Sequence, residues 1–516
     1  MTAETELTGL TKRALAGTAW SSISTVGKQA LTFASVATVA RILGPGAYGL
    51  MAMAVIVTNF VSNFRDLGTA VAIVQRPTVT RPLLSSLFWI NIGVGVLLCS
   101  AIALTAPLLA GFFHAPELTS ILRWLALALF LASGGVVHNA LLTREMSFKA
   151  IAIADLAAAS ASYAVALAGA LSGLGVWSLV FASVAGAAVS TAGYWLGSSF
   201  RPRREFDIAE VRSIARFSTH LSANGLANYA YRNSDNLIVG RFLGNVQLGF
   251  YQMAYNLMLA PIQNISAVIA SVLFPAFARI QEDNERFRRA YLRACMLTAL
   301  ITFPVMAGLG VVADPLIRTV LGKRWIGTIP IFEILAVVGL LQSVQTTVGI
   351  IYQAKGRTDW LFRWSLFTLT VSVLAFIVGV RFGTIGVAIA YAIANWLILA
   401  VPCFLVPFRL IGLKLRDFVV ALMPQLLVTA AMVICSLAWL SLLRHFSISN
   451  PWTLLISTSV VGATCYISGM LVWGHGALDH AEEILKSSDN ATLLRVLALL
   501  QRVRVKSFFG PRPDLT

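Results

Sequence analysis

Long apolar runs dominate this chain and constrain its fold more than any other feature. A helix needs about 20 mainly apolar residues to cross the hydrocarbon core of a membrane, and about fourteen runs of that length follow one another here. Hydrophobic residues make up 58% of the 516 residues, charged residues only 12%, and the mean hydropathy is +0.79. These values exclude an ordinary water-soluble domain. The sequence therefore predicts an all-α polytopic membrane protein.

The connectors between these runs are short, and none is long or polar enough to fold as a separate soluble domain. The first run lacks a small-residue cleavage site after a short apolar core, so we interpret it as a retained helix. The approximate bounds of the predicted spans are 17–40, 47–64, 84–110, 118–141, 150–171, 175–197, 214–239, 248–274, 291–312, 328–352, 361–380, 383–407, 418–442 and 452–473.

The basic residues alternate between the two sides of the predicted membrane. The net charge is +17, and most Lys and Arg residues fall in every second connector, counting the N-terminal tail as the first. The other connectors hold only Arg41, Arg123, Arg241, Arg318, Lys323, Arg324, Arg381 and Arg444. Basic connectors stay in the cytoplasm, so both termini are expected there. The charge thus indicates topology, and we expect no nucleic-acid partner.

A short phrase occurs twice. VARILGPGAYG (39–49) returns as VGRFLGNVQLG (239–249), and SGLGVWSLV (172–180) pairs with GTIGVAIAY (383–391). Two matches at similar offsets predict an internal duplication. Each copy would hold six spans, an even number, so the repeat is parallel, and such halves bind substrate between them. The predicted parts are an N-lobe (1–205), a C-lobe (206–412), two further helices (413–475) and a cytoplasmic amphipathic tail (476–516), with a central cavity between the lobes.

Polar residues recur at helical spacing in the seventh span. This stripe, with one adjacent cation, consists of His220, Asn224, Asn228, Tyr231, Arg232 and Asp235. Subtracting the repeat offset finds a matching polar stripe in the first span, made of Ser24, Lys28 and Thr32, followed by Ser35. Polar groups within a bilayer face protein or water, so both stripes are expected to line the central cavity.

Among the charged residues of the chain, Lys28 is expected to have the highest free-energy cost of placement in the membrane. It lies roughly 16 Å from the cytoplasmic start of its helix, near the bilayer midplane, with no acid close by in sequence. We interpret it as a residue that holds an anionic substrate. For Arg232 and Asp235 two interpretations stay open, a structural salt bridge or a role in the cavity. For Asp155 we favour a structural role over ion coupling. We interpret Arg65 as a boundary residue at the cytoplasmic interface of the membrane.

No cofactor or metal is expected. The cysteines lie in or beside apolar runs without metal-ligand spacing, and most simply serve packing: Cys99, Cys295, Cys403, Cys435 and Cys465.

Several stretches resemble a known family. VARILGPGAYGLMAMA, FRDLGTAVAIVQR and LLSSLFWIN are similar to the N-terminal half of Wzx-type polysaccharide transporters, particularly the colanic-acid-exporter branch. SDNLIVGRFLG and LGFYQMAYNL resemble the start of that family's second half. These transporters belong to the multidrug, oligosaccharidyl-lipid and polysaccharide exporter superfamily. The resemblance implies a V-shaped bundle of two six-helix lobes, with the first and seventh helices at the central cavity.

The resemblance also implies a task in the bacterial inner membrane. It is the flipping of an oligosaccharide linked to undecaprenyl pyrophosphate toward the outer leaflet, for exopolysaccharide or lipopolysaccharide synthesis. Lys28 and Arg232 would meet the pyrophosphate or acidic sugars. The implied partners are the lipid-linked oligosaccharide, membrane lipids, and a polysaccharide polymerase and copolymerase. The last two helices have a counterpart in lipid II flippases, where they help to form a lipid groove.

Three other functions deserve comparison. A polytopic glycan polymerase or glycosyltransferase would place acids or arginines in a substantial outer loop, and the chain shows no paired carboxylates or nucleophile motif. A cation-coupled drug antiporter of the same superfamily would share the two-lobe plan but would need buried titrating carboxylates. A channel would need a pore-loop or ring pattern, which is not visible. The cationic stripes favour the flippase, and not an enzyme.

Overall fold

The computed structural model describes residues 3–65, 68–76, 78–206 and 208–473. Within these ranges the protein is helical, without strands, which confirms the predicted all-α class. Ten helical stretches there are long and apolar enough to cross a membrane, and Thr358–Ile411 combines two predicted spans. The predicted spans 17–40, 214–239 and 248–274 lie on helices in which many side chains fall outside the described part. The chain is a multi-pass membrane protein.

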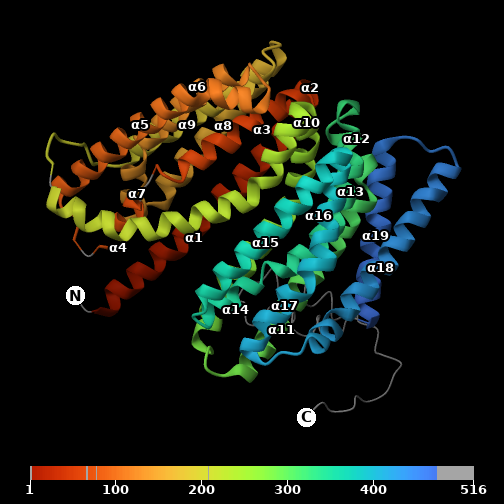
Figure 1. Ribbon diagram of the computed structural model, residues 1–516. Coiled ribbons are helices and arrows are strands. Elements are labelled where there is room, and N and C mark those ends of the chain that lie inside the picture. Colours follow the sequence, from red (N-terminus) through yellow and green to blue (C-terminus); the bar gives the residue numbers. More distant parts are fainter. Residues whose placement is uncertain (1–2, 66–67, 77, 207, 474–516) are drawn as a thin grey trace. The chain divides into compact units, whose positions relative to one another are not determined.

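The helices divide into two compact units (Figure 1). The first contains the described residues up to Gln252 together with Val320–Trp325, and the second contains Met253–Thr319 and the described residues from Ile326 onward. The predicted lobe boundaries at 205, 412 and 475 stay a prediction, and the predicted tail at 476–516 lies outside the described residues.

Most of the first unit is built from elements in the first half of the chain. They are α1 (Ala3–Ser35), the π-helical turn η1 (Val36–Ala40), α2 (Arg41–Leu43), α3 (Pro45–Ser62), α4 (Thr69–Gln75), α5 (Arg81–Phe113), α6 (Leu118–Ser133), α7 (Val136–Arg144), α8 (Phe148–Leu171), α9 (Val176–Gly197) and the first part of α10 (Ile208–Arg279). In this unit α5 lies against α6, and α8 packs against both α1 and α9 (Figure 1).

Small residues let the helices of the first unit approach closely. A Cβ added at Gly193 on α9 would lie 2.6 Å from Cβ of Ala154 on α8, and one at Gly169 would lie 2.8 Å from Cβ of Ser178. Close packing of small residues is a common way for membrane helices to associate, because lipid tails remove the usual hydrophobic drive between helices. The pairing of α8 with α9 therefore follows from their content of Gly, Ala and Ser.

The second unit holds the rest of α10 and the later helices. They are α11 (Asn284–Val311), α12 (Ala313–Val320), α13 (Thr328–Gln345), α14 (Val348–Ala354), α15 (Thr358–Gly379), η3 (Val380–Phe382), α16 (Gly383–Ile393), the π-helical turn η4 (Ala394–Leu399), α17 (Ala400–Ile411), α18 (Leu415–His445) and α19 (Pro451–Trp473). The last residue of α12, Val320, belongs to the first unit. The core of the second unit is aromatic, with Tyr291, Phe404, Phe408 and Phe418 buried together, and α18 pairs with α19.

The repeated phrase adopts the same turn twice. Gly44 has φ 78° and ψ 178°, and Gly244, which interrupts α10, has φ 81° and ψ −179°. Residues with a Cβ avoid this region of backbone space, so both positions require glycine. The second pair of matching stretches agrees less closely, because α9 begins at Val176 whereas α16 begins at Gly383, the partner of Ser172.

These two turns contact each other inside the first unit. A Cβ added at Gly49 would lie 1.7 Å from the carbonyl oxygen of Asn245, and one at Gly249 would lie 2.1 Å from the carbonyl oxygen of Pro45. Because Pro45 and Asn245 are equivalent in the repeat, as are Gly49 and Gly249, the contact is approximately symmetric. Backbone therefore lies directly against backbone at this place.

A segment from much later in the chain completes that contact. Trp325, in the 3₁₀ turn η2 (Lys323–Trp325), is fully buried, and its indole N–H donates to the carbonyl of Ala40 at 2.8 Å. Its ring packs edge-on against Tyr48 and Phe250, with centroid distances of 5.5 and 6.3 Å. We call the set Pro45, Gly49, Asn245, Gly249 and Trp325 the repeat junction.

Candidate functional site

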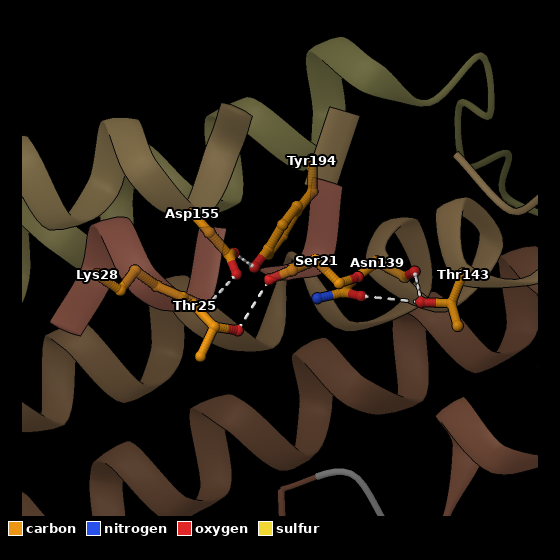
Figure 2. Close-up of polar contacts among 7 residues, drawn as sticks. All are labelled: Ser21, Thr25, Lys28, Asn139, Thr143, Asp155 and Tyr194. Atoms are coloured by element: carbon orange, nitrogen blue, oxygen red, sulfur yellow. Dashed lines mark hydrogen bonds and ion pairs between the residues drawn. The ribbon is translucent and has the colours of Figure 1, made fainter. Parts of the chain in front are cut away.

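Lys28 is paired with an acid from a different helix. Its ammonium Nζ on α1 lies 2.7 Å from Oδ2 of Asp155 on α8 (Figure 2). The Lys28 side chain is 43% exposed and that of Asp155 is 19% exposed, so the ammonium is the more open end of the pair. The sequence did not predict this partner, because 127 residues separate Lys28 from Asp155.

A third helix holds the other carboxylate oxygen. The phenol of Tyr194 on α9 donates to Oδ1 of Asp155 at 2.5 Å, so Tyr194 and Lys28 converge on the same group (Figure 2). Helix α1 comes close to α8 beside this group, since a Cβ added at Gly27 would lie 2.6 Å from the side chain of Leu156. We call Lys28, Asp155 and Tyr194 the charged seam.

The other polar residues of α1 have unequal environments. Ser24 is buried, with its hydroxyl unpaired among the described contacts, whereas Thr32 is exposed and donates to the carbonyl of Lys28 at 2.8 Å. Thr25 makes the same kind of bond to Ser21, four residues earlier. Such bonds to the preceding turn satisfy a hydroxyl within its own helix. The lining role predicted for Ser24 and Thr32 stays a prediction.

The predicted stripe of the seventh span is described only at its end. His220, Asn224, Asn228 and Tyr231 fall on α10, but their side chains lie outside the described part.

At that end the structure places Asp235 and Arg232 differently. Asp235 is 3% exposed and accepts from the phenol of Tyr251 at 3.2 Å and from the backbone N–H of Asn236 at 2.7 Å. Arg232 is exposed, and no ion pair in the described part of the chain joins it to Asp235. The salt bridge between Arg232 and Asp235, which was one of the two open interpretations, is therefore not formed in the described part of the structure.

A cavity that was not predicted from the sequence lies near the end of α3. About 400 Å³ in volume, it lies between α4 and α7 in the first unit. Its polar lining consists of Arg65, Gln75, Asn139 and Thr143, and its apolar lining of Ala70, Val71, Val74, Val136 and Ala140. Thr143 also bonds to Asn139 beside the charged seam (Figure 2). A guanidinium and two amides give this cavity the donors that an oxygen-rich group needs. Arg65, which we interpreted as a boundary residue, therefore lines a cavity.

Residues 38–330 match the family described as "Polysaccharide biosynthesis protein". That is more than half of the chain. The protein belongs to this family. The matched range includes the repeat junction, Arg65, Asp155 and Tyr194, and begins after Lys28.

Several relatives align with most of the chain. The lipopolysaccharide biosynthesis protein WzxC of Escherichia coli is 29% identical over 80% of this chain and 85% of its own length. The teichuronic acid biosynthesis protein TuaB of Bacillus subtilis is 29% identical over 89% of this chain and 95% of its own length. The succinoglycan biosynthesis transport protein ExoT of Rhizobium meliloti is 27% identical over 87% and 90%. The resemblance to Wzx-type transporters is confirmed.

Solved structures give the fold of this family member independently. The lipid II flippase MurJ in an inward closed conformation aligns with a TM-score of 0.70 and 16% identity, over 89% of this chain and 99% of that chain. A multidrug resistance MATE transporter of the MOP superfamily, inward-facing, aligns with a TM-score of 0.61 and 19% identity, over 75% and 94%. At such identities the likeness concerns the fold, and it agrees with a polytopic helical transporter.

Proposed function

We propose that this protein flips an oligosaccharide linked to undecaprenyl pyrophosphate across the bacterial inner membrane by alternating access. Membership of the polysaccharide biosynthesis family supports this, as do relatives named for lipopolysaccharide, teichuronic acid and succinoglycan synthesis. The likeness in fold to a lipid II flippase is compatible with it. The polysaccharide made from the flipped unit would be an exopolysaccharide or a lipopolysaccharide.

One observation in the structure carries the proposal. Lys28 is a cation on a predicted membrane span, and its side chain is 43% exposed. A charge at such a depth is costly unless it faces protein or water, and it usually marks a substrate or ion pathway. A pyrophosphate group, which must cross the apolar core during flipping, is the anion that such a cation suits. Lys28, with Arg232 as the second cation, would meet this group.

The remaining parts of the assignment follow from that task. Both termini lie in the cytoplasm, the partners are the lipid-linked oligosaccharide and membrane lipids, and a polymerase and copolymerase receive the flipped unit. The protein makes and breaks no covalent bond, so it is a transporter and not an enzyme. The predicted stripe residues His220, Asn224, Asn228 and Tyr231 would contact the sugar, as would Thr32. Asp235 and Ser24 are buried in this structure and would not contact it directly.

Export measurements with matched cations test the assignment. In a strain that lacks the gene, undecaprenyl-linked repeat units should accumulate on the cytoplasmic side. Lys28→Ala and Arg232→Ala should each abolish polysaccharide export while the protein stays in the membrane in normal amount. The exposed cations Lys414 and Arg381 supply the controls, and their alanine variants should export normally. Normal export by both Lys28→Ala and Arg232→Ala would refute the cationic site.

Cation-coupled export of a small molecule is the second candidate. It is favoured by the carboxylate of Asp235, which is 3% exposed within a predicted span and is contacted by neutral donors, the phenol of Tyr251 and the backbone N–H of Asn236. A buried carboxylate of this kind suits the binding of a proton or sodium ion. A deletion strain with increased sensitivity to cationic drugs and unchanged lipid-linked sugars would decide for this function.

A further inference from the structure

The two partners of the Asp155 carboxylate hold different oxygens. Lys28 of α1 contacts Oδ2 at 2.7 Å, and Tyr194 of α9 donates to Oδ1 at 2.5 Å. If Lys28 moved away, the carboxylate would keep the phenol of Tyr194. A buried charge that loses every partner is strongly destabilising, and one that keeps a hydrogen bond is much less so. Asp155 would therefore keep one hydrogen-bond donor if Lys28 left it.

The exposed fractions of the Lys28 and Asp155 side chains also indicate that Lys28 is the partner that can leave. Asp155 is largely enclosed, at 19% exposure, while Lys28 is open at 43%. An ammonium group has three N–H donors, and the described contacts use one of them on Asp155. A lysine is also a compact charge on a flexible stem, and unlike the fork of an arginine it changes partners without losing a paired geometry. An incoming anion can thus contact Lys28 before Asp155 has left.

We propose that Asp155 is an internal counterion, which neutralises Lys28 while the site is empty and is displaced from it by a phosphate group of the substrate. Asp155 is then a specificity residue of the cationic site, and Tyr194 is a positioning residue that retains the displaced carboxylate. The identity of the anion rests on the proposed function. The exchange itself rests on the contacts of the charged seam.

The exchange selects for strongly charged anions. An uncharged or zwitterionic solute gains little from Lys28, because Asp155 already neutralises it. A pyrophosphate carries more charge than one carboxylate and offers more acceptor oxygens, so it forms the stronger charge-assisted bonds with the ammonium. Displacing Asp155 also breaks the ion pair that joins α1 to α8 in the described part of the chain. Binding of the anion would thereby loosen one attachment of the first helix.

Binding of inorganic pyrophosphate to the purified full-length protein tests the exchange. Asp155→Asn removes the competing charge but keeps the shape, so pyrophosphate should bind up to about fivefold more tightly than to the wild type. Lys28→Gln should abolish binding, both alone and combined with Asp155→Asn. If Asp155 merely fastens α1 to α8, Asp155→Asn will instead lower the unfolding temperature and leave binding unchanged or weaker, which overturns the proposal.

Tyr194→Phe provides a second test that leaves the Lys28 and Asp155 pair in place. Without the phenol, a displaced Asp155 keeps no donor, so pyrophosphate should bind several-fold more weakly. In the Asp155→Asn background the same change should have no effect on binding. Equal weakening by Tyr194→Phe in both backgrounds contradicts the retention of Asp155 by Tyr194. Tyr194→Phe alone keeps the Asp155 charge, so unchanged pyrophosphate binding by this variant contradicts the retention even if Asp155→Asn folds poorly.

The outcomes separate this inference from the proposed function. The binding measurement uses neither a lipid-linked sugar nor transport. Tighter binding by Asp155→Asn together with normal lipid-linked sugars in the deletion strain would leave the exchange standing and refute the flippase. Absence of pyrophosphate binding in both the wild type and Asp155→Asn overturns the exchange, whatever the deletion strain accumulates.

Discussion

The repeat junction and the charged seam lie in the same helical unit but are built by opposite means. In the junction, carbonyl oxygens lie against glycines and a fully buried tryptophan fills the remaining space. In the seam, three charged or polar side chains meet across helices, and the cation stays 43% exposed. Shape complementarity at close range is costly to disturb, whereas a partly solvated ion pair contributes little to stability. We therefore expect changes in the repeat junction to affect mainly stability, and changes in the charged seam to affect mainly transport.

The largest expected effect is the removal of Trp325. Trp325→Ala deletes a fully buried ring, its contacts with Tyr48 and Phe250 and its bond to the carbonyl of Ala40. Loss of a buried tryptophan costs about 3–5 kcal/mol in the free energy of unfolding. The unfolding temperature of the purified protein in detergent should fall markedly.

An exposed tryptophan serves as the control for that change. Trp452 is the second residue of α19 and is 58% exposed, so Trp452→Ala should leave the unfolding temperature nearly unchanged. Trp325→Phe keeps most of the ring but loses the N–H donor, and it should fall between the two. If Trp325→Ala and Trp452→Ala unfold at the same temperature, the junction does not govern stability.

Alanine at the two contact glycines should have the next largest effect. In Gly49→Ala the new methyl would lie 1.7 Å from the Asn245 carbonyl oxygen, and in Gly249→Ala 2.1 Å from that of Pro45, so the backbone must shift. Overpacking of this kind costs about 1–3 kcal/mol. Because the contact is approximately symmetric, both variants should lower the unfolding temperature by similar amounts.

Gly93→Ala is the matched control for the glycine variants. Gly93 lies within α5, and an added Cβ there would meet nothing within 4 Å. Alanine in an open helical position is stabilising by about 0.5–1 kcal/mol relative to glycine. A Gly49→Ala protein as stable as Gly93→Ala would show that the two turns do not press against each other.

The contrast also explains what the sequence could and could not predict. The turns at Gly44 and Gly244 follow from local backbone requirements, so the repeated glycines are visible in the sequence and the helical class follows from the apolar runs. Trp325 bonds to a carbonyl 285 residues away. Such contacts depend on tertiary packing, which leaves no local pattern.

The seam shows the same limit at the candidate site. Lys28 stands out in the sequence because a charge interrupts an apolar run, but its partner is 127 residues distant. Asp155 and Tyr194 sit on different helices, and only the packing of α1 and α9 on α8 brings them together. A single acid and a single tyrosine in apolar helices have no spacing that predicts this pairing.

The smallest expected effect is the stability cost of breaking the seam. Lys28→Gln and Asp155→Asn, measured singly and together, give the coupling between the two side chains. With Lys28 43% exposed, solvent screens the pair, and the coupling should be only about 0–1 kcal/mol. Lys28→Gln should nevertheless abolish polysaccharide export. Loss of export without loss of stability places the cation in substrate handling, because a residue needed mainly for folding would change both. A coupling of several kcal/mol would instead make the seam a structural element like the junction.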